Sequence, residues 1–447
     1  MDLISSCRKA ISYDTSPAHG TKELVGFLSA IAQDRGLFVE TQEAVHDGIE
    51  QSNIIIRPTP GRPASEFLFQ THLDTTDPGS HSVWKKTGQN PFDATILDHR
   101  IYGLGAADVK LDFICKLEAM SKFSQKTNWK LPPVLLGTFG EEIGMIGAMK
   151  IIRSNKVSPR FAIISEPTNK KLVNKAKGIA TVEIKIPFST EEITYRQSHN
   201  EKESTSTQSK LFHGKAAHSS MPHLGESAIV KLLDYVLQLP EDIVLIEVDG
   251  GTNFNSVPTH AFVEIDPNTM SKSVGGRLGK IYRYIKGLEQ EFSLYKDNDF
   301  DPAFPTLNIG IIRTTEDHIF ISGTCRIPPV VTQSVYEGWM KGLDQICKDN
   351  GAVFKVTDYK RPFYTSENSI LIKGCLDELK HMGLSHQLTS QASTNEASLF
   401  SRLGIDCVCF GPGEREGNIH TPEESVSIDD IHQSIEFYSR LIERFCL

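Results

Sequence analysis

The residues best suited to chemistry are acids and imidazoles that follow apolar, strand-like runs. They are His72 after "EFLFQT", Asp108 after "IYGLGAA", Glu141 and Glu142 after "VLLGTFG", Glu166 after "AIIS", and His420 after "DCVCFGPGEREGNI". Ligands of an open α/β sheet bind outside the carboxyl ends of its strands. The sequence therefore predicts one site built from five strand ends.

Two imidazoles and several carboxylates are a donor set for a pair of divalent metal ions. Imidazole with carboxylate suits zinc, and additional carboxylates admit manganese or cobalt. A bridging carboxylate lets two ions lie roughly 3.5–4 Å apart. Asp74, two residues after His72, is placed to accept the other imidazole N–H. Each residue alone also has an ordinary structural interpretation, such as a turn aspartate beside glycine, but the ordered set favours a metal site.

The stretch "GTFGEEIG" (137–144) places two acids side by side after an apolar run. Successive side chains at a strand end point in different directions. One of Glu141 and Glu142 can therefore face a metal while the other faces the attacking water. The flanking glycines leave room for the turn.

The elements that must position these residues alternate between strands and helices. Strands are predicted at 66–71, 134–139, 161–165 and 406–410, and helices at 22–36, 109–123, 367–383 and 427–445. This alternation predicts an α/β domain with a mostly parallel sheet flanked by helices.

The middle of the chain differs, because long strands such as 179–188 and 318–327 are interspersed with helices such as 226–240 and 336–351. We predict an inserted α+β domain at 178–361 between two catalytic segments, 1–177 and 362–447. The polar segment 189–209 lacks apolar periodicity and is predicted to be an exposed excursion, either a long hairpin or partly disordered.

Composition excludes some classes of function. The 447 residues carry a net charge of -9 and no long Lys/Arg run, which argues against a nucleic-acid partner. No stretch approaches transmembrane length, and the N-terminus lacks a signal-peptide core, which argues against a membrane partner. Eight cysteines without framework spacing indicate reduced thiols. A cytoplasmic protein is expected.

As an ordered set, the motifs resemble the M20 family of metallopeptidases and deacylases, which includes acetylornithine deacetylase, succinyl-diaminopimelate desuccinylase, aminoacylase-1 and glutamate-releasing carboxypeptidases. The resemblance covers nearly the whole chain. It runs through "THLDTTDP", "YGLGAADVK", "TFGEEIG", "SEPTN", "HGKAAHSSMPHLGESAI", "FNSVPTHA", "CRIPP" and "FGPGEREGNIHTPEE". It implies a zinc-peptidase-like catalytic domain, two divalent metals, and an inserted lid through which family members often form homodimers.

The resemblance also implies residue roles. One metal would be held by His72, Asp108 and Glu166, and the other by Asp108, Glu142 and His420. Glu141 would be the general base, with Asp74 as the outer partner of His72. In the lid, His218 would help to stabilise the oxyanion, while Asn255 and Arg326 would bind substrate, Arg326 through a carboxylate.

Three departures from the family bear on substrate choice. Leu111 and Asp112 stand where glycines are usual, and Thr324 stands where the last lid motif often has aspartate. Asn255 and Arg326, whose motifs are usually close in sequence, are about seventy residues apart. That separation resembles the family's dipeptidases, whereas glutamate at position 166 resembles its deacylases and carboxypeptidases. We predict amide hydrolysis of an N-acyl amino acid or related small substrate, with a dipeptidase or carboxypeptidase as the alternative. A non-catalytic relative that only binds a small molecule or a partner protein would lack one of the metal-binding residues or Glu141. All of these residues are present in this sequence.

Overall fold

The computed structural model describes residues 1–200 and 207–447, and it divides into two compact units. Unit 1 contains Met1–Lys175, Phe363–Ser390 and Asn395–Leu447. Unit 2 contains Ala176–Pro362 and Gln391–Thr394. The chain therefore leaves the first unit once, builds most of the second, and then returns.

Unit 1 contains a nine-stranded mixed sheet. In spatial order its strands are β1 (Phe38–His46), β2 (Ile49–Arg57), β6 (Pro133–Thr138), β3 (Glu66–His72), β7 (Pro159–Ile164), β18 (Asp406–Cys409), β8 (Leu172–Ala176) and β16 (Phe363–Tyr364), with β17 (Leu388–Gln391) beside β8. The central run β6-β3-β7-β18 pairs in parallel, whereas β1 with β2, β2 with β6, and β8 with β18 pair antiparallel. The parallel strands are therefore the centre of the sheet.

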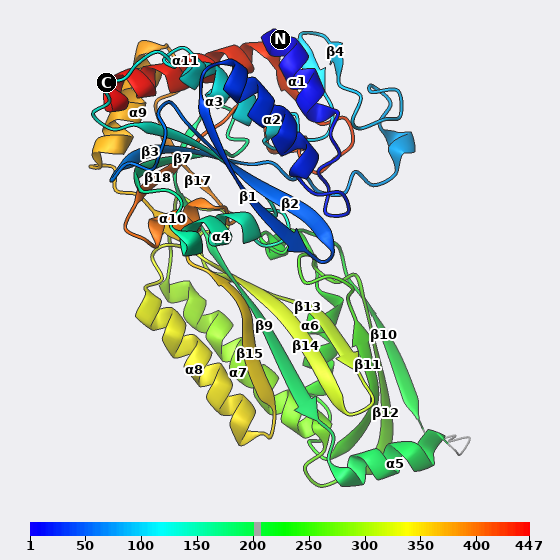
Figure 1. Ribbon diagram of the computed structural model, residues 1–447. Helices are drawn as coiled ribbons and strands as arrows, with labels where there is room; N and C mark the ends of the chain where they lie inside the picture. The colour runs from blue at the N-terminus through cyan, green and yellow to red at the C-terminus, as the bar shows by residue number, and fades with distance from the viewer. Residues whose placement is uncertain (201–206) are drawn as a thin grey trace. The chain divides into compact units, whose positions relative to one another are not determined.

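Helices cover both faces of this sheet (Figure 1). They are α1 (Leu3–Ile11), α2 (Lys22–Asp34), α3 (Lys110–Ser121), α9 (Ile370–His381) and α11 (Ile428–Cys446) on one face, and α4 (Ile146–Ser154) and α10 (Ala397–Ser401) on the other. Every residue of β3 and β6 is buried, as expected for parallel strands covered on both faces. Phe69 of β3 packs edge-on against Tyr438 of α11 in the main core.

Unit 2 is a seven-stranded antiparallel sheet with helices. Its strand order is β10 (Gln208–His213), β12 (His260–Thr269), β11 (Ile243–Gly250), β13 (Thr306–Thr314), β14 (His318–Ile327), β9 (Gly178–Pro187) and β15 (Val353–Lys360). Its helices are α5 (Thr190–Asn200), α6 (Ala228–Val236), α7 (Val274–Glu291) and α8 (Gln333–Asp349). The α/β fold with an inserted α+β unit is confirmed.

The hairpin predicted for 189–209 is wrong where the structure describes that segment, although most of the residues described there are exposed or half-buried, as predicted. Residues 190–200 form α5, and Gln208 begins β10. Glu192 explains the helix despite its polar sequence, because its buried carboxylate accepts the Val274 N–H at 2.5 Å and a bond from Arg277 at 2.8 Å. Polar contacts with α7 thus stabilise α5, although its sequence lacks the apolar stripe by which helices are usually predicted. Residues 201–206 lie outside the described residues.

A membrane-crossing helix is absent from the described ranges, where none is both long and apolar enough. All eight cysteines are buried and unpaired.

Candidate active site

The central parallel strands bring four of the five predicted segments to one edge of the sheet. His72 is the last residue of β3, Glu141 follows β6, Glu166 lies two residues beyond β7, and His420 lies in the segment after β18. The fifth expectation is wrong in detail. Asp108 follows a strand of a separate three-stranded sheet and lies two residues before α3 begins. That sheet consists of β19 (Ser425–Ser427), β5 (Arg100–Tyr102) and β4 (Thr95–Leu97).

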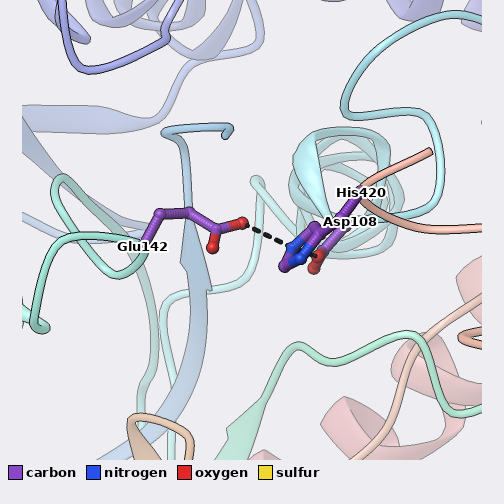
Figure 2. A group of neighbouring side chains, drawn as sticks. All are labelled: Asp108, Glu142 and His420. Carbon is purple, nitrogen blue, oxygen red and sulfur yellow. Dashed lines mark hydrogen bonds and ion pairs between the residues drawn. The ribbon is translucent and has the colours of Figure 1, made fainter. Parts of the chain in front are cut away.

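Asp108, Glu142 and His420 form a group that could hold a metal ion. One ligand atom from each lies within 4.8 Å of the others. The His420 Nε2 is 3.0 Å from an oxygen of Asp108 and 3.0 Å from one of Glu142 (Figure 2). Asp108 is buried, whereas the His420 side chain is 47% exposed. The backbone of His420 is left-handed, with φ +54°, a conformation that few non-glycine residues adopt.

His72 approaches the same aspartate from the opposite side. Its Nε2 lies 3.4 Å from Asp108 Oδ1, while Asp108 Oδ2 contacts His420. The carboxylate of Asp108 therefore lies between the two imidazoles. The His72 Nδ1 is 3.1 Å from the carbonyl oxygen of Asp74 and 3.7 Å from that residue's carboxylate. Its hydrogen bond goes to the main chain, and the Asp74 carboxylate is an ion-pair neighbour.

The Asp74 carboxylate instead holds the loop that carries the paired acids. Its two oxygens accept the backbone N–H groups of Glu141 at 3.1 Å and Glu142 at 3.0 Å. Gly140, with φ +68°, makes the turn that presents both amides to it. Asp74 is buried, which raises its pKa to about 6. The two glutamates thus leave a main chain that is fixed at two consecutive amides.

The charges at this edge favour a cation. Burial alone would lower the pKa of both histidines, but Asp108 outweighs it and holds the pKa of His72 well above its usual value. Asp108 and Glu142 likewise raise the pKa of His420 to about 11. The carboxylates therefore bind positive charge strongly, and without a metal that charge is carried by protons. Two carboxylates and an imidazole within reach of one point fit a zinc-type ion.

Glu141 is electrostatically distinct from the residue beside it. Burial raises the pKa of its carboxyl group well above the usual value, and the nearby carboxylates of Glu142 and Glu166 add to the rise while His72 opposes it. A carboxylate whose charge is disfavoured accepts a proton readily. This setting is compatible with the general-base role that the sequence motifs predict for Glu141.

Glu166 is buried, and the structure pairs it with Arg415 rather than placing it in the Asp108 group. The Arg415 guanidinium donates to Glu166 Oε2 at 2.5 Å. Sequence reasoning missed Arg415, although it lies inside the "GPGEREGNIH" motif.

Two further buried carboxyl groups support the site and were also missed. Glu424 Oε1 accepts the backbone N–H groups of Ala107 at 2.8 Å and Asp108 at 2.9 Å. Glu396 accepts hydrogen bonds from Gln70 and Thr138, on the two strands that lead to His72 and Glu141. Glu424 could have been predicted, because it is the second acid of the "HTPEE" motif. No pattern in the sequence around Glu396 indicates its role.

The remaining predicted residues lie in unit 2. His218 and Asn255 are joined through the main chain, because Ser219 N–H donates to the Asn255 carbonyl at 2.9 Å. The Ser220 N–H donates to His218 Nδ1 at 3.1 Å, so a neutral His218 carries its proton on Nε2. Arg326 lies on β14 and is buried.

A group of carboxylates and imidazole at the carboxyl edge of a sheet's parallel centre is the arrangement expected of a metal-dependent hydrolase. The sequence model of peptidase family M20/M25/M40 matches residues 68–444. The chain therefore belongs to peptidase family M20, as the sequence motifs predicted.

Curated relatives agree with this assignment. An acetylornithine deacetylase from Myxococcus xanthus is 21% identical over 99% of this chain and 97% of its own length. Another, from Buchnera aphidicola subsp. Schizaphis graminum, is 38% identical over 28% of this chain, a match that spans only 31% of the relative.

Two crystal structures share the fold. An aminoacylhistidine dipeptidase from Vibrio alginolyticus has a TM-score of 0.65 at 16% identity, covering 99% of this chain and 96% of its own. An M20 family metallo-carboxypeptidase from Sulfolobus solfataricus has a TM-score of 0.62 at 20% identity, covering 100% and 99%.

Proposed function

We propose that this protein is a di-metal-dependent hydrolase that cleaves the amide bond of an N-acyl amino acid or a related small substrate. The observation that carries the proposal is the group of Asp108, Glu142 and His420, with Glu141 held beside it by Asp74. A group that could hold a metal next to a base is what metal-dependent amide hydrolysis requires.

The metals would be held by His72, Asp108 and Glu166 on one side and by Asp108, Glu142 and His420 on the other. Zinc suits these donors best, with cobalt or manganese as alternatives. When bound, such ions polarise the scissile carbonyl and acidify a water molecule.

The chain's own residues would supply the rest of the chemistry. Glu141 takes a proton from the attacking water and delivers it to the leaving amine. The resemblance assigns oxyanion stabilisation to His218, and a ring protonated on Nε2 has the donor that this role needs. Asn255 and Arg326 are proposed to bind substrate, with the Arg326 guanidinium taking a carboxylate.

Two lines of support favour a deacylase. Glu166 is a glutamate, which resembles the deacylases and carboxypeptidases of the family, and the relative that spans nearly the full chain is named an acetylornithine deacetylase. The wide separation of Asn255 and Arg326 in the chain supports the alternative, a dipeptidase or carboxypeptidase acting on short peptides. The fold is common to both kinds of enzyme and does not choose between them.

A substrate panel decides between the two activities. We expect the zinc-loaded protein to release amine from N-acetyl amino acids, N-acetylornithine among them, with kcat/KM at least about 10-fold above that for dipeptides, a difference of about 1.4 kcal/mol in transition-state binding. The assay is detection of the released primary amine, and protein stripped with a chelator is the control. Preference for dipeptides with a free amino terminus would establish the alternative.

We also infer a cytoplasmic homodimer joined through unit 2. Buried, unpaired cysteines suit a reducing compartment, and β10 and β15 end the strand order of the unit 2 sheet, where another chain can pair. Light scattering is expected to give twice the chain mass of 49.7 kDa. A mass of one chain at micromolar concentration would contradict the dimer.

A further inference from the structure

A buried group of polar side chains lies behind the predicted metal ligands. We call it the α3 polar cluster: Asp112 and Lys116 of α3, Thr71 of β3, Ser165 after β7, and Tyr438 of α11. All five residues are at most 2% exposed. The proposed chemistry uses none of them, and a buried charged pair is expensive to desolvate.

Asp112 is the acceptor at the centre of the cluster. Its carboxylate accepts from the Tyr438 hydroxyl at 2.8 and 2.9 Å and from the Ser165 hydroxyl at 2.5 Å. The Lys116 Nζ lies 3.1 Å from the same carboxylate, one helical turn further along α3. The carboxylate is therefore compensated by three donors from three different parts of the chain.

Lys116 connects α3 to the two strands. Its Nζ donates to the Gln70 carbonyl at 2.7 Å, to the Thr71 hydroxyl at 3.3 Å, and to the Ser165 hydroxyl. The Thr71 and Ser165 hydroxyls also contact each other at 2.7 Å. One ammonium group thus joins the ends of β3 and β7 from behind.

The cluster is adjacent in sequence to three predicted ligands of one metal. Thr71 immediately precedes His72, Ser165 immediately precedes Glu166, and Asp112 lies four residues after Asp108. Burial energy alone does not account for such a pair, because an apolar pair of similar volume is often as stable as a buried ion pair or more so. Its value lies in geometry, since directional bonds fix the spacing of the three segments.

We propose that Asp112 and Lys116 are positioning residues that set the spacing of His72, Asp108 and Glu166, and thereby strengthen cation binding by these three residues. The inference rests on the proposed two-metal function. Residues behind metal ligands typically contribute 10- to 100-fold in affinity by orienting them.

The test replaces the charged pair with an apolar one, in the variant Asp112→Leu/Lys116→Met. Zn²⁺ is titrated by calorimetry into chelator-stripped protein, and Tm is measured for each variant. We expect a folded protein in which one of the two Zn²⁺-binding events, the one assigned to His72, Asp108 and Glu166, loses about 10- to 100-fold in affinity. The event assigned to Asp108, Glu142 and His420 is expected to change less.

A matched control lies at the other end of the same strand. Arg57 and Glu66 are also a buried ion pair, 2.7 Å apart, and Glu66 is the first residue of β3. Arg57→Met/Glu66→Leu is expected to alter Tm without changing Zn²⁺ affinity. If this control lost Zn²⁺ affinity equally, the loss in the Asp112→Leu/Lys116→Met variant would be explained by general destabilisation of the sheet. That result would overturn the proposal.

The remaining outcomes are also decisive. A folded Asp112→Leu/Lys116→Met protein that binds two Zn²⁺ with parental affinities overturns the positioning role alone. A parent that binds no Zn²⁺ instead overturns the proposed function. If the double variant does not fold, Ser165→Ala, which removes only the hydroxyl shared by Asp112 and Lys116, is measured in the same way; we expect about a 10-fold loss, and parental affinity counts against the proposal.

Discussion

Glu141→Gln lowers kcat for amide hydrolysis by about 10²–10⁴-fold and leaves the metal content at the parental level, the loss typical of removing a general base. Glutamine keeps the shape of the side chain but cannot accept a proton. The backbone is unaffected, because the Glu141 N–H remains bound to Asp74. Metal content by mass spectrometry and turnover of the best panel substrate measure the two effects separately.

The neighbouring residue supplies the control for this experiment. Glu142 contacts His420 at 3.0 Å, so Glu142→Gln is expected to lose metal as well as activity. If Glu141→Gln instead retains parental turnover, the mechanism is wrong. If Glu142→Gln keeps its metal while Glu141→Gln loses it, the ligand and the base are the other way round.

Asp108→Asn is expected to bind metal at least about 10²-fold more weakly and to be inactive at zinc concentrations that saturate the parent. Asp108 contacts both imidazoles, at 3.4 Å from His72 and 3.0 Å from His420. Asparagine removes the negative charge that they share. Calorimetric titration of stripped protein with Zn²⁺ measures the loss, and Tm shows that the fold persists.

Asp406→Asn is the matched control for Asp108. Asp406 begins β18 in the same unit, where it accepts a bond from the Ser369 hydroxyl at 2.6 Å. Its replacement is expected to leave Zn²⁺ affinity unchanged. Parental affinity in Asp108→Asn would show that the cation binds elsewhere.

Local patterns in the sequence were sufficient for the sheet centre and its helices. The runs that contain His72, Glu141 and Glu166 are short, apolar and bounded by turns, and α11 follows helical periodicity. Asp108 was assigned to the wrong sheet, because a glycine-rich turn after β5 looks the same whichever sheet that strand joins.

Contacts between distant residues could not be predicted in this way. Glu166 and Arg415 are 249 positions apart, and Asp108 and Glu424 are 316 apart. No periodicity in one sequence encodes such pairs. Helix α5 was not predicted for a related reason, because Glu192 stabilises it through hydrogen bonds to residues more than 80 positions away.

The position of β18 has a consequence for synthesis of the protein. This strand comes from the last tenth of the chain, yet it lies inside the sheet, between β7 and β8. By the time β18 is translated, the other eight strands of that sheet and the whole of unit 2 have already been made. Until then β7 and β8 have unpaired edges, and His420 has not been translated. A nascent chain that has not yet reached β18 therefore cannot assemble the proposed metal centre.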